Sequence, residues 1–132
     1  MDDAGLVTVH SRNPVKQTVD RLEAALTAAG VTVFARIDHA AGAASVGMAL
    51  RPTELLIFGN PKAGTPLMQA RQTIGIDLPL KILGWEDKAD TVWLTYNDPA
   101  WLATRHGLGA ETQAASAGMA AMLSKLVTAA TE

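Results

Sequence analysis

The segment Gly59–Thr65 gathers residue types that together could bind a negatively charged ligand. It combines two glycines, a lysine and a pattern that begins a helix. The N-terminus of a helix offers unpaired N–H groups and a partial positive charge, which suit an anion. We therefore take Asn60, Lys62, Gly64 and Thr65 as candidate ligand-binding residues. The structural alternative is that Asn60 closes a tight turn and Thr65 caps the next helix.

The two glycines of this segment have the spacing of a phosphate-binding loop, but the residues around them differ. In such a loop, a lysine and then a serine or threonine follow the second glycine. Here Thr65 follows Gly64 directly, and Lys62 precedes it. We therefore expect no nucleotide hydrolysis at this segment.

The three histidines are the other candidates for chemistry. Asp38 precedes His39, and a carboxylate beside an imidazole can fix the tautomer of the ring. Adjacent strand residues point to opposite faces, however, so capping of the next helix by this pair is the alternative. We take His39 as a candidate ligand-binding residue, and either His39 or His106 as a candidate general base.

Haem or a metal ion could bind through His39, His106 or Met68 if the fold brought these residues together. No two histidines have the helical spacing of metal ligands. A methionine on a helix more often packs against apolar neighbours than binds a metal. The sequence therefore predicts no cofactor and no metal site.

Composition excludes several classes of protein. The 132 residues are 48% hydrophobic and 18% charged, which predicts one globular domain over residues 1–132. The absence of cysteine excludes disulfides and thiolate catalysis. The net charge is −2 and the cations are scattered, so we expect neither a nucleic-acid partner nor a membrane contact. The acidic start Met1–Gly5 lacks the pattern of a secretory leader and predicts a cytoplasmic protein.

Hydrophobic periodicity predicts an α+β fold. One strand, a helix and four more strands precede a final helix, with short helical insertions between the strands. Such an order favours a single, mainly antiparallel five-stranded sheet with helices packed on one face. The first helix is expected to be capped by Ser11 or Asn13, and a later one to begin at Thr65–Pro66. The expected strands cover residues 6–10, 31–38, 54–59, 80–85 and 91–96, and the two long helices cover 14–29 and 111–130.

The sheet face that the helices leave uncovered is expected to be rich in aromatic residues. If Val33, Ile82 and Leu94 face the helices, alternation turns the side chains of Phe34, Leu83, Trp85 and Trp93 away from them. An exposed apolar patch usually marks a partner or ligand surface. We expect a homodimer packed through this face. A ligand cleft, for which Trp93 is a candidate residue, and coverage by the inserted helices are the alternatives.

The run Leu50–Met68 resembles domain-of-unknown-function family 302, and the resemblance spans essentially the whole chain. It implies a fold similar to the TATA-binding-protein-like class and no known activity. DNA binding does not follow from the fold, because function lies in sites and the basic surface is missing. The other matching segments are Phe34–His39, Leu78–Leu83, Trp85–Asp87, Tyr96–Pro99 and Arg105–Gly107.

The sequence thus predicts a small homodimeric ligand-binding or sensing domain without catalytic activity. One alternative is a small enzyme that binds an anionic substrate at Gly59–Thr65 and uses His39 or His106 as general base. The other alternative is a structural or assembly domain that acts through the aromatic face. The sequence identifies no ligand and no reaction.

Overall fold

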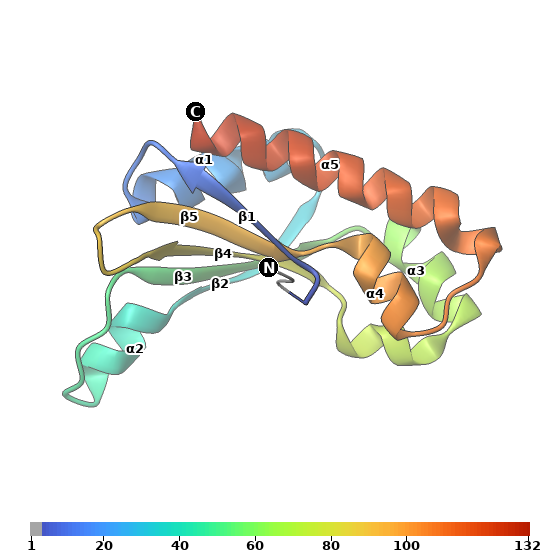
Figure 1. Cartoon of the computed structure of the whole chain (residues 1–132), viewed down its shortest axis with the longest axis horizontal. Coiled ribbons are helices and arrows are strands. Elements are labelled where there is room, and N and C mark those ends of the chain that lie inside the picture. The colour runs from blue at the N-terminus through green and yellow to red at the C-terminus, as the bar shows by residue number, and fades with distance from the viewer. Residues whose placement is uncertain (1–3) are drawn as a thin grey trace.

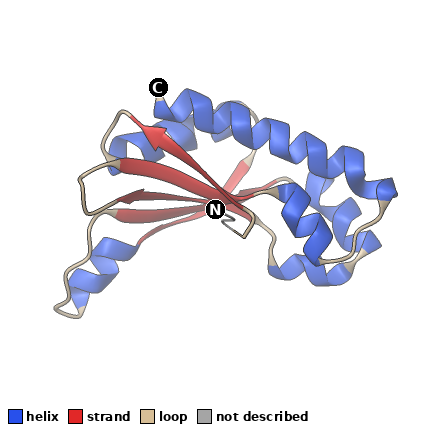
Figure 2. Ribbon diagram, in the orientation of Figure 1, coloured by secondary structure: helices blue, strands red, loops and turns tan. Residues whose placement is uncertain are grey.

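A computed structural model describes residues 4–132 of the chain. The acidic residues Asp2 and Asp3, on which the expectation of a leaderless protein rests, lie outside this range. The strands form one five-stranded sheet in the order β1-β5-β4-β3-β2, and all neighbours are antiparallel (Figure 2). The predicted α+β class is therefore confirmed. The strands are β1 (Leu6–Ser11), β2 (Thr32–Asp38), β3 (Thr53–Gly59), β4 (Leu80–Glu86) and β5 (Val92–Asn97).

Two long helices, α1 (Val15–Ala28) and α5 (Gln113–Thr131), pack side by side on one face of the sheet (Figure 1). Apolar residues at steps of three and four turn one side of α1 towards the sheet. Alternate residues of the strands meet them, and water is excluded between the two layers. The largest fully buried side chains of this core include Leu22, Leu26, Leu56, Phe58, Ile82, Leu94 and Leu123.

Shorter helical segments extend the two ends of the sheet (Figure 1). The helix α2 (His39–Ser45) follows β2 and projects from one end. At the other end lie α3 (Pro61–Ala70), the 3-10 turn η1 (Gln72–Ile76) and α4 (Pro99–Arg105). A second 3-10 turn, η2 (Ala110–Thr112), leads into α5.

The structure corrects two helix starts. The helix α3 begins at Pro61, one turn before the expected Thr65, because Asn60 caps it and proline suits the first helical position. The predicted Gly59–Thr65 loop is thus the first turn of α3. The helix α1 begins at Val15, and no side chain caps it. The Ser11 hydroxyl instead accepts the backbone N–H of Asn13.

Candidate functional site

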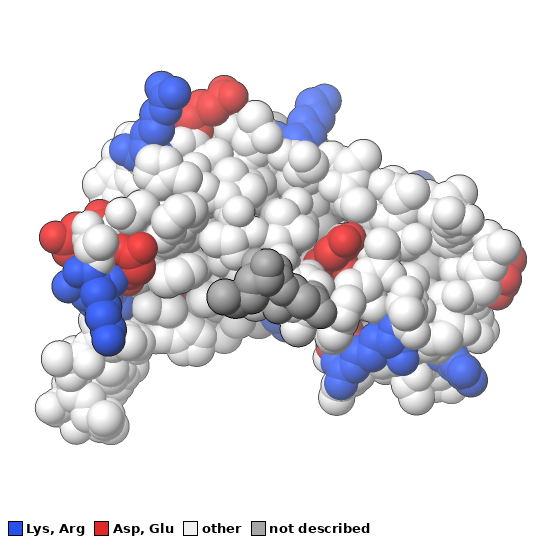
Figure 3. Space-filling model, viewed as in Figure 1, with Lys and Arg blue, Asp and Glu red and all other residues white. Residues whose placement is uncertain are grey.

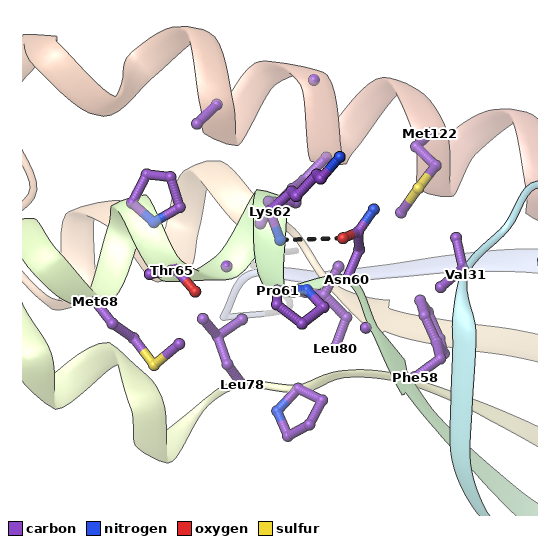
Figure 4. Close-up of a pocket in the computed structure, with 18 of the residues that line it drawn as sticks. Val31, Phe58, Asn60, Pro61, Lys62, Thr65, Met68, Leu78, Leu80 and Met122 are labelled. Carbon is purple, nitrogen blue, oxygen red and sulfur yellow. Dashed lines mark hydrogen bonds between the residues drawn. The ribbon is translucent and has the colours of Figure 1, made fainter.

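A pocket of about 610 Å³ opens between α3, α5 and the end of the sheet (Figure 4). This volume lies within the ~300–1,000 Å³ that small-molecule sites usually have. Strand β3 ends at Gly59, and its chain turns directly into α3, so the first turn of α3 forms one wall. The N-terminal half of α5 forms the opposite wall. The lining is mainly apolar and includes Val31, Phe58, Ala63, Met68, Leu78, Leu80, Ala115, Gly118, Met119 and Met122.

The first turn of α3 uses its backbone N–H groups internally. The side-chain oxygen of Asn60 accepts the N–H of Lys62 at 3.0 Å (Figure 4). The carbonyl oxygen of Asn60 accepts the N–H groups of Ala63 and Gly64 at 2.9 and 3.1 Å. Capping therefore occupies the donors that the sequence suggested for an anion.

Lys62 is the one charged residue among those described that line the pocket. Its side chain extends from α3 towards α5 (Figure 4). Within residues 4–132, no hydrogen bond or ion pair is found for its ammonium group. The positive charge at this site therefore comes from a side chain and not from the helix terminus.

Gly64 and Thr65 also line the pocket, as does Asn60. Gly64 is buried, and a Cβ atom built there would lie 3.6 Å from Leu78 and 3.8 Å from Met68. Gly64 therefore brings the backbone of α3 close to the pocket floor. Four of the six predicted ligand-binding residues thus lie together at one cavity. The sequence predicted an anion-binding site at these residues, whereas most of the cavity lining is apolar.

The methionines give the lining an adaptable shape. Met68 comes from α3, and Met119 and Met122 come from α5. A thioether side chain is unbranched and polarizable, so it can repack around ligands of different outline. Met68 and Met122 lie at different ends of the pocket in Figure 4, so their sulfur atoms do not converge on one point.

The other two predicted ligand-binding residues lie elsewhere. His39 begins α2, and the Asp38 carboxylate before it accepts the N–H of Ala41 at 2.9 Å, as a helix cap does. Trp93 lies on β5, with its ring centroid 5.5 Å from His10 and 6.5 Å from Trp85. Neither His39 nor Trp93 lines the pocket.

His106 belongs to a polar cluster between α4 and η1. Its Nε2 lies 2.5 Å from a carboxylate oxygen of Asp77, and its Nδ1 lies 3.2 Å from the hydroxyl of Thr73. Arg105 contacts the same carboxylate at 3.0 Å, and Arg71 donates to the carbonyl of His106. The cluster ties the end of α4 to η1. Sequence reasoning named His106 but missed Asp77 and Thr73, because they are 29 and 33 positions away and carry no motif.

Residues that could hold a metal ion are not gathered in the part of the chain that the structure describes. No group of three or more histidine, aspartate or glutamate side chains there has a suitable arrangement. His39 and His106 lie at opposite ends of the sheet, with α2 and α4 respectively, while Met68 lines the pocket (Figure 1).

The face of the sheet opposite α1 and α5 is apolar, and we call it the open face. Leu55, Ile57, Leu83, Trp85 and Trp93 define it, and each is half-buried. The alternation predicted from the sequence is therefore present for Trp85 and Trp93, whereas Phe34 lies at a register shift of β2 and lines the pocket. Among the described elements, α3 packs against α5 and η1, and α4 packs against α5, so neither covers this face.

Both tryptophans of the open face have their indole N–H groups paired within the chain. Trp85 donates to the hydroxyl of Thr95 at 2.8 Å, and Trp93 donates to the carboxylate of Asp87 at 2.9 Å. The bond from Trp93, with backbone N–H groups of the β4–β5 turn, lowers the pKa of Asp87 below its ordinary value. The open face therefore presents ring surface and no unpaired indole donor.

Comparison with curated proteins finds relatives that are much longer than this chain. "Fluoride-specific ion channel FluC 1" of Brucella suis biovar 1 (strain 1330) is 55% identical over 117 residues, which are 89% of this chain and 46% of that protein. The protein of the same name from Brucella abortus biovar 1 (strain 9-941) is also 55% identical over 117 residues, 43% of its length. The chain thus spans less than half of these relatives. Within residues 4–132, no helix has the length and apolar character needed to cross a membrane.

Comparison with solved structures and families gives the fold and the family. The crystal structure of an uncharacterized conserved DUF302 protein from Bacillus stearothermophilus superposes with a TM-score of 0.85. The match covers 97% of this chain and 98% of that one at 18% identity, so it establishes the fold alone. Residues 7–126 match the family described as "Domain of unknown function DUF302". The chain therefore belongs to the DUF302 family.

Proposed function

We propose that this chain is a ligand-binding domain whose pocket holds a molecule with an apolar body and one anionic head. The observation that carries the proposal is the 610 Å³ pocket, lined by apolar side chains with Lys62 as its charged residue. An apolar body would displace water from the lining, and an anionic head would pair with the ammonium group. The adaptable methionines suit a class of related ligands better than one rigid molecule.

A ligand in this position would connect parts of the fold that are separate in the chain. It would touch α3 on one side and α5 on the other, and α5 also packs against α1, α4 and β1. Occupancy of the pocket would therefore bias the position of a helix that spans the molecule. This arrangement supports a sensing role without catalysis, and we include a homodimeric, cytoplasmic state in the proposal.

The proposal is tested by calorimetric titration with decanoate and with decan-1-ol, which share an apolar chain and differ in the charge of the head group. We expect decanoate to bind more tightly. Lys62→Met should weaken decanoate binding about fivefold and leave decanol binding unchanged, since an exposed ion pair contributes at most about 1 kcal/mol.

The matched control is Lys125→Met, which removes the same charge from α5 at an exposed position outside the pocket lining. It should leave both affinities as they are. Equal losses in the two lysine variants would mean that only the net charge matters. Failure of both probes to bind would reject an amphiphile of this kind as the ligand.

The names of the Brucella relatives suggest fluoride as a candidate ligand. We propose instead that the matched part of those proteins is a ligand-responsive domain joined to a channel part. Fluoride needs hydrogen-bond donors, and the N–H groups of Lys62, Ala63 and Gly64 are already paired with Asn60. A fluoride titration followed by ¹⁹F NMR should show no saturable binding. Saturable binding that Lys62→Met abolishes would make fluoride the ligand.

An enzyme is the second candidate, and the cluster around His106 supports it. The hydroxyl of Thr73, the ring of His106 and the carboxylate of Asp77 are in contact in that order. Such an order can activate a hydroxyl group towards an ester carbonyl. The test is hydrolysis of p-nitrophenyl decanoate. Turnover that Thr73→Val and His106→Gln both abolish would favour an enzyme, whereas turnover equal to the buffer rate would reject this one.

A further inference from the structure

The open face has an uncharged central row that crosses all five strands and is apolar over β2, β3 and β4. The strand registers place Thr8, Thr95, Leu83, Leu55 and Ile37 side by side in one row. The tryptophan pair lies in the next row, where Trp93 is opposite Trp85. The open face could therefore form one side of an interface between two packed sheets. No described element of the chain covers it.

The segment after β2, residues 39–50, also exposes apolar side chains, and we call it the arm. Val46, Met48 and Leu50 are 71%, 67% and 50% exposed. The arm projects beyond the sheet on the side away from α5, and it is uncharged in the space-filling view (Figures 1 and 3). Its seven-residue helix α2 buries none of its own residues. Within the chain this short helix is held by the Asp38 cap and by contacts with β3, and it leaves apolar surface available to a partner.

We propose that a second copy of this chain covers the open face, and that the arm of each copy packs on the open face of the other. A two-fold interface requires each copy to carry both halves of a reciprocal contact. This chain carries an apolar arm and an apolar face on the same side of the sheet. The inference names the surface of the homodimer included in the proposed function, and it does not depend on the ligand of the pocket.

Charge on the two surfaces also fits a contact between copies. The arm from Ala40 to Leu50 contains no acidic or basic residue. The central row of the open face contains none either, and both indole donors are already paired. Burying the arm against the central row therefore leaves no uncompensated charge in that row and no unpaired indole N–H, while Lys81 and His10 lie in the rows on either side of it. A partner with a charged surface would lose its hydration there without gaining an ion pair.

Sedimentation equilibrium of the full chain tests the proposal. The wild-type chain should be a dimer at micromolar concentration. Met48→Glu on the arm and Leu83→Glu on the open face should each raise the dissociation constant at least about 30-fold, because each puts a charge into the centre of the interface. The control is Ile76→Glu on η1, which changes an apolar residue that is 77% exposed and lies at the other end of the sheet from the arm. It should leave the constant unchanged.

A cross-linking experiment tests the reciprocal contact directly. The chain has no cysteine, so introduced thiols are the only ones present. A mixture of Met48→Cys and Thr8→Cys chains, treated with a short bismaleimide, should give a cross-linked product that contains one of each. A mixture of Ile76→Cys and Thr8→Cys should give none.

Three results would overturn the proposal. They are a monomeric wild type, a dimer that neither glutamate variant weakens, and a dimer without the arm-to-face cross-link. Circular dichroism of each variant verifies that it is folded, and Met48 is exposed enough that its variant should fold even if the Leu83 variant does not. Decanoate binding by a monomeric Met48→Glu chain would keep the pocket proposal intact, so the two proposals can fail separately.

Discussion

The two faces of the sheet carry similar side chains but differ in what covers them. The covered face contributes Leu56, Phe58, Ile82 and Leu94 to a core in which these side chains are almost fully buried under α1 and α5. The open face presents residues such as Leu83 and Trp93, which the chain leaves half-buried. The comparison shows that one sheet can bury one face in the core and leave the side chains of the other face partly exposed. Apolar character alone does not distinguish the two uses.

The largest expected effect is a difference between the two faces in how much a substitution lowers the free energy of unfolding. Leu94→Ala should lower the free energy of unfolding by about 2–5 kcal/mol, because it opens a cavity in a closed core. Leu83→Ala should cost less than about 2 kcal/mol, since its side chain stays partly in water within one copy. Urea unfolding in the Met48→Glu background, where dimer formation does not contribute, measures both. Equal losses of unfolding free energy in the two variants would mean that both faces contribute equally to the stability of a single chain.

The next effect separates association from ligand binding. Trp93→Glu should raise the dimer dissociation constant by about 100-fold, as expected for an aromatic residue at an interface centre. Its affinity for decanoate should not change, because Trp93 does not line the pocket. Sedimentation and calorimetry on the same preparation give the two values. If Trp93→Glu also lowered the affinity for decanoate, Trp93 would contribute to ligand binding, as the sequence predicted.

A smaller effect concerns the pocket on the covered side. A Cβ atom at Gly118 of α5 would meet no atom within 4 Å, and this residue lines the pocket. Gly118→Ala should therefore stabilise the chain by about 0.5–1 kcal/mol through helix propensity. Gly118→Leu should extend into the pocket and weaken decanoate binding about tenfold. Thermal unfolding and titration follow the pair, and a leucine variant with wild-type affinity would place the ligand elsewhere.

The smallest effect is a pH dependence at the edge of the open face. The indole N–H of Trp93 and backbone N–H groups of Thr91 and Ala89 lower the pKa of Asp87 below its ordinary 3.8. A carboxyl with a lowered folded pKa stabilises the fold above its unfolded pKa. That contribution is lost as the pH falls through the lower folded pKa. Asp87→Asn should therefore flatten the acid side of a plot of melting temperature against pH. An unchanged acid side would show that this hydrogen bond does not matter to stability.

Much of the fold could be predicted from the chain because strand and helix periodicity are local. Val15, Val19, Leu22 and Leu26 recur at helical steps, and they form the buried side of α1. The helix starts were less predictable. Both Asn60 and Thr65 are good capping residues followed by proline, so the local signal could not choose between them. The structure begins α3 at the first of these two prolines.

The candidate site was only half predictable. Asn60, Lys62, Gly64 and Thr65 were found because they are adjacent in the chain and carry recognisable types. The opposite wall from α5 was not found, because Met119 and Met122 look like ordinary core residues of an amphipathic helix. The contact of His106 with Asp77 was missed because the two residues are 29 positions apart and carry no motif.

The sequence by itself determined which residues are apolar, the order of the strands and helices, and that one sheet face would remain rich in aromatic side chains. These properties follow from residue type and from the periods of strands and helices. Only the tertiary structure decided that α3 and α5 enclose a pocket, that the amides beside Asn60 are already occupied, and that α2 buries none of its own residues. Such facts depend on contacts between segments far apart in the chain, and local periodicity carries no information about them.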